Sequence, residues 1–206
     1  MIYISHVFFG FIMSYVGLLP PGMLNMTTVR TTIEKGKKAG FLFSAGAASV
    51  VFVQASIALI FANYLNNHPD IIEKLKIAGI VVFILLAIFF WIQARKKFKA
   101  EGKQKQGNYF LTGLMMSSMN MLAIPFYLGL SAYLGANGNL ILEQPYITVF
   151  VIGAVLGAFA LFSTYLGFAK IIINKAQFIA KNINYILSAL FLVLALLTTL
   201  KVLNVN

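Results

Sequence analysis

The sequence predicts an all-α, polytopic membrane protein of about six transmembrane helices. Of its 206 residues, 60% are hydrophobic and only 10% are charged, whereas a soluble domain carries about 25% charged residues. The mean hydropathy is +0.88. Six apolar stretches approach the roughly 20 residues that a helix needs to cross a bilayer, and they lack the polar alternation of transmembrane β-strands. These stretches are Phe8–Leu19, Ala39–Leu65, Ile77–Ile92, Phe110–Leu134, Ile147–Ala169 and Ile183–Leu203.

The first and fourth stretches contain helix breakers. The first begins without Lys or Arg, unlike the basic start of a cleaved signal peptide, so we interpret it as a span. It runs into Pro20-Pro21-Gly22, and the fourth stretch contains Pro125. Proline removes a backbone donor and clashes with the carbonyl four residues earlier. In a bilayer such a break must face protein or a water-filled cavity, so we predict that both spans are interrupted.

The second and fifth stretches are rich in small residues. Gly40 and Gly46 lie in one, and Gly153 and Gly157, in a GxxxG spacing, lie in the other. Such residues let helix backbones approach closely in membranes, so we expect close helix packing here. The aromatic side chains, Tyr127 among them, are expected to form interface belts and lipid-facing bulk.

The basic residues alternate between the predicted connections. Thirteen of the sixteen lie in the first, third and fifth connections, Met26–Lys38, Arg95–Gly107 and Lys170–Lys181. Cytoplasmic loops of membrane proteins collect Lys and Arg, so these connections are predicted to be cytoplasmic and both termini to lie outside, in a bacterial inner (plasma) membrane. The net charge of +11 is therefore a topology signal, and we expect no nucleic acid partner.

The most polar segment, 95–107, divides the chain into two halves. We interpret it as a basic cytoplasmic linker, with binding to anionic lipid headgroups as a secondary possibility. Each half holds three spans, so the half 108–206 enters the membrane upside down relative to the half 1–94. The sequence thus predicts a single transmembrane domain, 1–206, made of two inverted three-helix repeats, as in several transporter folds.

Polar residues beside the breaks are candidates for binding a substrate. Asn25 follows Pro20 by five positions, and Asn120 precedes Pro125 by five. An interrupted helix leaves amides and carbonyls free to hold a solute, and an asparagine side chain adds both donors and acceptors. Alternatively, the prolines only kink the helices and the asparagines satisfy the freed carbonyls. The candidate substrate-binding residues are Pro20, Pro21, Gly22, Asn25, Asn120, Pro125, and, in the second span, Ser49 and Gln54, for which interhelical hydrogen bonding is the alternative role.

The sequence lacks the residues that several kinds of chemistry require. It has no cysteine, its five acids lie in connections or at span ends, and His6 and His68 are expected to be solvated. No intramembrane acid is available as a proton carrier, and no metal-binding, nucleotide-binding or hydrolytic motif is readable. We therefore expect a protein that is not an enzyme and that uses no metal or other cofactor.

The segment Leu19-Pro20-Pro21-Gly22-Met23-Leu24-Asn25 resembles the proline-glycine signature of the LysE family of amino-acid exporters. The basic run from Lys35 to Lys38, which leads into a glycine-containing second span with Gly40 and Gly46, also matches that family. In the fourth span, Gly113 and Asn120 occupy comparable places. The resemblance covers the whole chain in layout, and it implies six spans and the export of small solutes.

The sequence also departs from the family pattern. Met23 stands where the family has its second signature proline, and the proline that follows Asn120 directly in the family is displaced to Pro125. Many members carry an aspartate in the second span, and Ser49 stands near its place. The resemblance then implies a divergent member that exports a neutral solute.

Two functions remain open on the sequence. The first is a secondary transporter that exports amino acids or similar small solutes by alternating access, with the lipid bilayer and a small molecule as its partners. The second is a non-transporting membrane subunit that assembles with a partner protein, which suits the glycine faces and the lack of a charged coupling residue. A homodimer is compatible with so small a chain.

Overall fold

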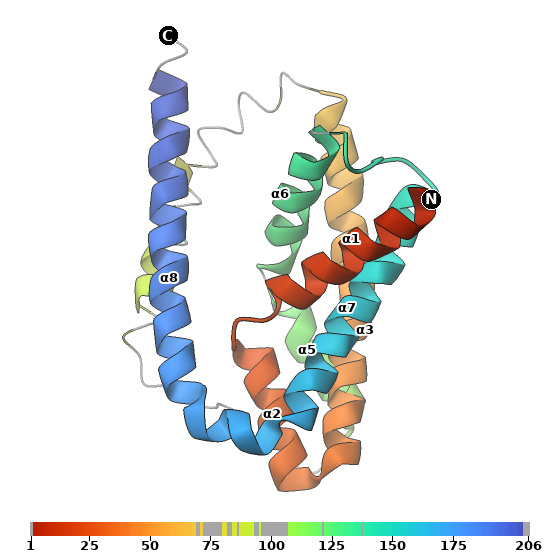
Figure 1. Ribbon diagram of the computed structural model, residues 1–206, viewed down its shortest axis with the longest axis vertical. Helices are drawn as coiled ribbons and strands as arrows, with labels where there is room; N and C mark the ends of the chain where they lie inside the picture. Colours follow the sequence, from red (N-terminus) through yellow and green to blue (C-terminus); the bar gives the residue numbers. More distant parts are fainter. Residues whose placement is uncertain are drawn as a thin grey trace. The chain divides into compact units, whose positions relative to one another are not determined.

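A computed structural model describes residues 2–68, 71, 80–81, 84–85, 87–92, 95, 107–120, 122–136 and 138–203, and all the regular elements that it describes are helices. They are α1 (Ile2–Gly17), α2 (Met23–Lys35), α3 (Lys37–Asn66), α5 (Tyr109–Ser118), α6 (Ala123–Ala136), α7 (Tyr146–Gly167) and α8 (Ala169–Leu203) (Figure 1). Two compact units are formed. Unit 1 comprises residues 1–66 and 100–174, and unit 2 comprises residues 67–99 and 175–206.

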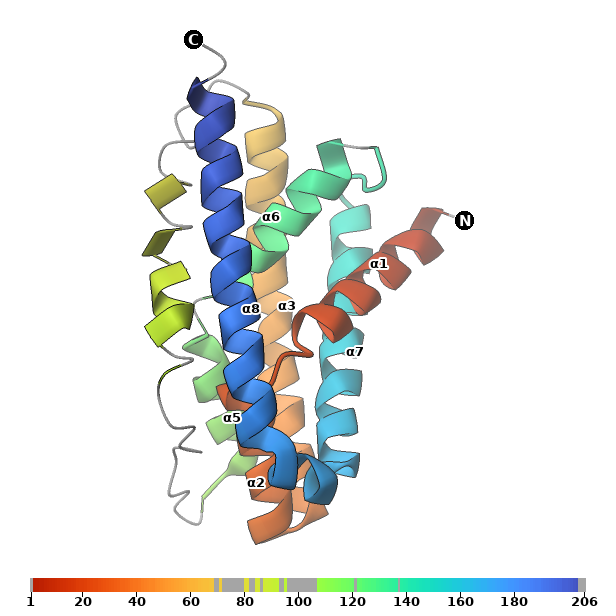
Figure 2. The same ribbon diagram turned by 60° about the vertical axis from the view of Figure 1, so that its left-hand side comes forward.

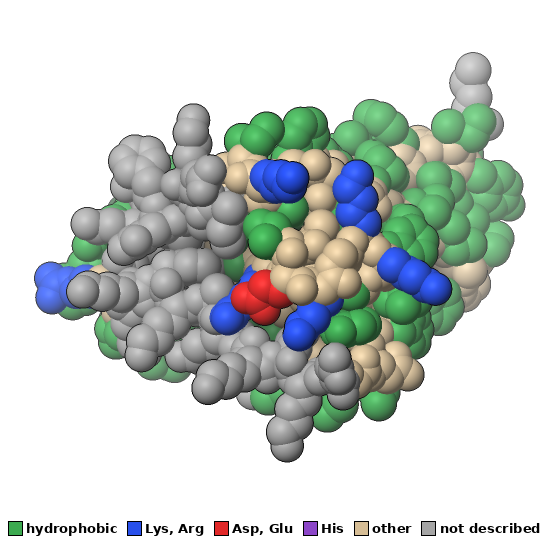
Figure 3. Space-filling view, turned by 90° about the horizontal axis from the view of Figure 1, so that it is seen from below, with side chains coloured by type: hydrophobic (Ala, Val, Ile, Leu, Met, Phe, Trp, Pro, Cys, Tyr) green, Lys and Arg blue, Asp and Glu red, His purple; other side chains and the backbone are tan. Residues whose placement is uncertain are grey.

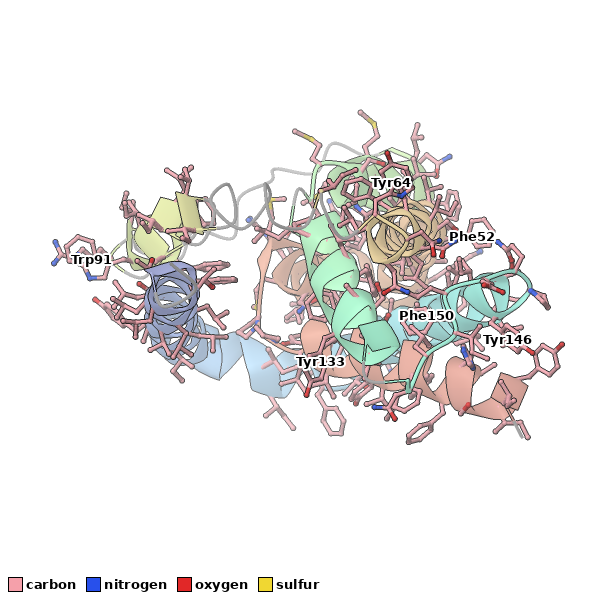
Figure 4. All side chains as sticks on the ribbon, turned by 90° about the horizontal axis from the view of Figure 1, so that it is seen from above. Phe52, Tyr64, Trp91, Tyr133, Tyr146 and Phe150 are labelled. Carbon is pink, nitrogen blue, oxygen red and sulfur yellow. The ribbon has the colours of Figure 1, made fainter. Side chains whose placement is uncertain are left out.

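Two long helices, α3 and α7, are at the centre of unit 1 and pack against each other, with α1, α2, α5 and α6 around them (Figures 1 and 2). Phe43 of α3 and Phe150 of α7 are both fully buried between helices. Phe52, Tyr64 and Tyr133 instead lie at the outside of the unit, about half exposed or more (Figure 4). A helical unit with large apolar side chains on its outside as well as its inside is suited to lipid rather than water.

Glycines set the crossing of α1 with α7. A Cβ atom added to Gly10 would overlap the backbone of Phe150 and Ala154, and one added to Gly153 would overlap the backbone of Val7. Gly157 meets the next turn of α1 in the same way. Nothing larger than glycine fits, so the two backbones are in direct contact.

The crossing of α5 with α3 is built from the same residue types. A Cβ atom on Gly113 would overlap the backbone of Phe43 and Ala47, and one on Gly46 would overlap the backbone of Phe110. The pattern Phe-x-x-Gly-Ala thus occurs once in α3, at positions 43–47, and once in α7, at positions 150–154. A single glycine of a shorter helix packs against each copy: Gly113 of α5 against the copy in α3, and Gly10 of α1 against the copy in α7. The predicted close packing at the four small residues is confirmed, since Gly40 likewise abuts Thr32 across the α2–α3 turn.

The predicted first connection, Met26–Lys38, is wrong as a loop. It is helical except for Gly36, whose positive φ of 90° allows α2 and α3 to be joined by a single residue. Its basic residues and the lack of an apolar stretch led to the prediction, yet Thr27, Thr28 and Thr32 within it are buried. Each of these hydroxyls donates to the carbonyl four residues earlier in α2, which removes the cost of burying it.

The predicted fifth connection, Lys170–Lys181, is wrong as a loop as well. Helix α8 runs through it without interruption, and neither Gly nor Pro occurs anywhere along α8. The predicted linker 95–107 lies outside the described residues except for Arg95 and Gly107.

By length and apolar composition, α3 and α7 qualify as membrane spans, and α5 with α6 qualifies as a third if the bent pair is one span. Helix α1 and residues 188–200 of α8 are apolar but shorter. Of the roughly six predicted spans, two or three are therefore matched by described helices that are long and apolar enough to cross a membrane. The first predicted span is shortened because it ends at Gly17, and most of the third lies outside the described residues.

Unit 2 contains part of the third predicted span and most of α8. The Ser188 hydroxyl donates to the Ala87 carbonyl at 2.9 Å, and the rings of Phe90 and Phe191 stack with centroids 5.6 Å apart. An apolar groove of about 270 Å³ lies along this contact and includes Trp91. It contains none of the candidate site residues.

One end of unit 1 is basic. Exposed lysines and the partly exposed Arg30 surround the α2–α3 turn and the start of α8, and an acidic side chain lies among the blue ones in Figure 3. Arg30 and Glu34 form an ion pair at 2.6 Å. We call this the basic end, and it comprises Arg30, Lys35, Lys37, Lys38 and Lys170.

Candidate functional site

The first span is interrupted between α1 and α2, at residues 18–22, which we call break 1. Pro20 and Pro21 have no N–H to continue the helix, and each disfavours helical geometry in the residue before it. The helix therefore ends with the Leu18 N–H donating to the Ser14 carbonyl at 3.0 Å. It starts again after Gly22, which is the N-terminal cap of α2.

Side chains satisfy the carbonyls of break 1. Asn25, only 3% exposed, donates from Nδ2 to the Leu18 carbonyl at 2.6 Å and to the Pro20 carbonyl at 2.9 Å. Tyr165 of α7 donates from its hydroxyl to the Leu19 carbonyl at 2.6 Å. Three consecutive carbonyls released by the prolines thus have partners, as burial in a membrane demands.

The fourth span is interrupted between α5 and α6, at residues 119–122, which we call break 2; Met121 is outside the described residues. The two half-helices are bent by 62°, and α6 lies at an angle to α3 (Figure 2). Pro125 is in the first turn of α6, where proline lacks no needed donor, and it is exposed. Proline therefore begins a helix here, whereas it ends one at break 1.

Break 2 is held from α3. Gln54, 6% exposed, donates from Nε2 to the Ser117 carbonyl at 2.9 Å and makes a longer contact of 3.5 Å with the Asn120 carbonyl. The side-chain amide of Asn120 is partly exposed and makes no hydrogen bond to any other described residue. Each central helix thus contributes one polar side chain to one break.

The end of α1 lies against the start of α6. Ser14 and Tyr127 share a hydrogen bond of 2.7 Å, and both are at most 1% exposed. Gly17 abuts the ring of Phe126, where a Cβ atom would overlap it. The Ser14–Tyr127 hydrogen bond thus joins the end of α1 to the start of α6.

The remaining candidates are placed differently. Ser49 is exposed, donates to the Ala45 carbonyl at 2.8 Å and lines a groove of about 200 Å³ with Ser118 and residues of α3 and α5. Gly22 borders open space, since the nearest atom to an added Cβ is the Pro20 carbonyl oxygen at 3.9 Å. Of the eight candidates, Pro20 with Asn25 and Gln54 with Asn120 are joined by hydrogen bonds.

Sequence reasoning missed the tyrosines. Tyr127, predicted to face lipid, is 1% exposed, and Tyr165 is 8% exposed. The prediction for Tyr127 was wrong because a buried phenol is stable once its hydroxyl has a partner, and the partners come from distant helices. A tyrosine within an apolar span is the signal that would have found them.

His6 was also wrongly predicted to be solvated. It is 2% exposed, since its ring lies beside Tyr146, with centroids 5.1 Å apart. The Ile141 N–H donates to Nε2 at 2.9 Å, so Nδ1 holds the proton and donates to the Ile2 carbonyl at 2.7 Å. The ring joins α1 to the loop before α7. Among the described residues no group of three or more His, Cys, Asp or Glu side chains is placed to hold a metal ion.

The apolar helices indicate a helical integral membrane protein, and buried polar side chains bond to the backbone at both breaks. Residues 15–201 match the family of the LysE type translocator, so the chain belongs to this family of membrane translocators. The predicted family resemblance is thereby confirmed. Comparisons with curated proteins and with solved structures gave no match. The matched region includes both breaks and the whole of α2, α3, α5, α6 and α7.

Proposed function

We propose that this translocator is a secondary transporter that exports amino acids or similar small solutes by alternating access. The observation that carries the proposal is the pair of breaks within unit 1, at each of which a buried side-chain amide, Asn25 or Gln54, bonds to backbone carbonyls. Transporters of several folds bind solutes at discontinuous helices near the bilayer midplane. The proposed site contains Asn120 and Gln54 at break 2 and Gly22 and Asn25 at break 1, with Pro20, Pro21, Pro125 and Ser49 around them.

The start of α2 supports binding of a carboxylate. The helix has no side-chain cap at Gly22, and the first N–H groups of any helix have no partner within it. These groups carry partial positive charge and favour an anion. Open space beside Gly22 leaves room for such a group to approach the backbone.

The two matching crossings support an inverted repeat. Gly10 meets the Phe-x-x-Gly-Ala pattern of α7 as Gly113 meets that of α3, which is the pairing that exchange of the two halves would produce. The basic end supports an orientation in which it faces the cytoplasm. On this proposal both termini lie outside and the protein is in a bacterial inner membrane.

An excretion experiment tests the proposal. Cells that make the protein are compared with cells that lack it, and the medium is assayed for a panel of amino acids. At least one amino acid is expected to accumulate faster outside the producing cells, and purified protein in proteoliposomes is expected to move that amino acid. No flux in either assay would overturn the proposal and leave the non-transporting subunit, to which the family match gives no support, as the reading to pursue.

A further inference from the structure

Break 2 contains an amide oxygen that accepts no hydrogen bond from the residues that the structure describes. Gln54 points its amide at the carbonyls of Ser117 and Asn120. Two carbonyl oxygens attract the nitrogen end of an amide and repel its oxygen end, so the environment fixes which atom is Nε2. The other atom, Oε1, is part of a side chain that is 6% exposed, and it accepts no hydrogen bond from any described residue.

The residue whose carbonyl this amide bonds, Ser117, has a buried hydroxyl that also bonds to no residue in the described part of the chain. Ser117 is 2% exposed, yet its Oγ makes no hydrogen bond to a described residue. Ser44, Ser49 and Ser118 each donate to the carbonyl four residues earlier. An unsatisfied buried hydroxyl costs about 1–3 kcal/mol, so the exception at Ser117 calls for a partner other than the described residues.

The partner of the Gln54 oxygen is a cation or a hydrogen-bond donor, because an amide oxygen can only accept. Helix α5 ends and helix α6 begins at break 2, so the partial negative charge of one helix end is offset by the partial positive charge of the other. Neither α5 nor α6 contains a charged residue, and the only charges in α3 are the two lysines at its far start. The groups that remain to meet a ligand are therefore neutral oxygens and the partly exposed amide of Asn120.

We infer that break 2 is a binding site for a monovalent cation, coordinated by the side-chain oxygens of Gln54, Ser117 and Asn120. A divalent cation normally requires carboxylate ligands, and this site has none. The cation is either a coupling ion such as Na⁺ or the ammonium group of the exported solute; both would be held by the same oxygens. The inference rests on the proposed transport function. The site would hold either an ion transported together with the solute or the ammonium group of the solute itself.

Thermal unfolding of the purified full-length protein tests the inference. Melting temperatures are measured in NaCl, methylammonium chloride and tetramethylammonium chloride at equal ionic strength, the last being a cation that cannot donate a hydrogen bond. Either Na⁺ or methylammonium is expected to raise the melting temperature relative to tetramethylammonium. A Na⁺ effect identifies a coupling ion, and a methylammonium effect identifies the ammonium group of the solute.

Two neighbouring serines provide the matched variants. Ser117→Ala is expected to weaken the apparent affinity for the effective cation by about tenfold, the equivalent of about 1.4 kcal/mol. Ser118→Ala is the control, because that exposed hydroxyl already bonds within α5, and it should behave as wild type. Equal cation responses in the two variants, or no response of the wild type to either cation, would overturn the inference.

Flux in proteoliposomes separates this inference from the proposed function. If export persists and no cation changes the melting temperature, the cation site is rejected and the proposed transport function stands. If the wild type moves no solute but shows a cation response that Ser117→Ala lacks, the cation site stands and the proposed transport function is rejected.

Discussion

Break 1 and break 2 arise from the same pair of residue types, but their hydrogen bonds are distributed differently. At break 1 the asparagine follows the proline, so Asn25 is in α2 and reaches back to two carbonyls of the break. At break 2 the asparagine precedes the proline, so Asn120 is within the break and its side chain bonds to no described residue. The order of proline and asparagine thus distinguishes the two amides. The Asn25 amide bonds to the backbone of its break, whereas the Asn120 amide bonds to no described residue.

The comparison shows that an interrupted helix is not in itself a binding site. Three carbonyls of break 1 are already occupied by Asn25 and Tyr165. Only the amide end of α2 and the space beside Gly22 are left there for a solute. At break 2 the side-chain oxygens of Gln54 and Ser117 have no hydrogen bond to any residue that the structure describes. We therefore expect changes at break 1 to act mainly on stability and changes at break 2 to act mainly on transport.

The largest effect is expected from Asn25→Ala. The substitution leaves the Leu18 and Pro20 carbonyls without their donors, and each buried unsatisfied group costs about 1–3 kcal/mol. A loss of about 2–6 kcal/mol in unfolding free energy should appear as a lower melting temperature and a reduced yield in detergent. Asn139→Ala, in an exposed loop, is the control. An unchanged melting temperature for Asn25→Ala would contradict the role given to this side chain.

Gly10→Ala and Gly113→Ala test whether the crossing of α1 with α7 and the crossing of α5 with α3 are equivalent. Each new Cβ would meet backbone atoms of α7 or α3, which cannot move aside as a side chain can. Overpacking of this kind costs about 1–3 kcal/mol, and the two variants should lose similar amounts. Gly129→Ala, where an added Cβ meets nothing within 4 Å, should be neutral or slightly stabilising. A large loss at only one of the two crossings would break the equivalence.

Asn120→Ala should leave the melting temperature unchanged, because the side chain makes no hydrogen bond to a described residue. Transport should nevertheless fall, with KM for the exported solute raised about tenfold if one hydrogen bond to it is lost. Flux in proteoliposomes at several solute concentrations measures this. A variant with wild-type flux would exclude Asn120 from the site.

The smallest effect is expected from Tyr165→Phe, which removes only the hydroxyl that bonds the Leu19 carbonyl. By the same rule, one buried carbonyl without its donor costs about 1–3 kcal/mol, about half the loss expected for Asn25→Ala. The melting temperature should therefore fall less than in Asn25→Ala, while Tyr185→Phe, at an exposed position of α8, should not change it. A loss as large as that of Asn25→Ala would mean that α7, rather than α2, holds break 1 together.

Sequence reasoning succeeded where a local rule decides the outcome. Pro20 and Pro21 end a helix wherever they occur, and small residues such as Gly153 have few roles in an apolar span other than close packing. It failed where basic residues without an apolar stretch were taken for a loop, as in α2, whose buried threonine hydroxyls bond their own helix. The partners of Tyr165 and His6 come from more than a hundred positions away, and no local pattern identifies such pairs. The repeated Phe-x-x-Gly-Ala pattern was readable, but its meaning depends on which helix each copy meets.

The glycine crossings have a consequence for motion. Where two backbones touch directly, one helix cannot slide along the other without a neighbouring turn colliding with it. Under the proposed alternating-access mechanism, α1 with α7 and α5 with α3 would therefore each move as one rigid pair. Each pair joins a half-helix of one half of the chain to a long helix of the other. Such a motion would bend the chain between α1 and α2 and between α5 and α6.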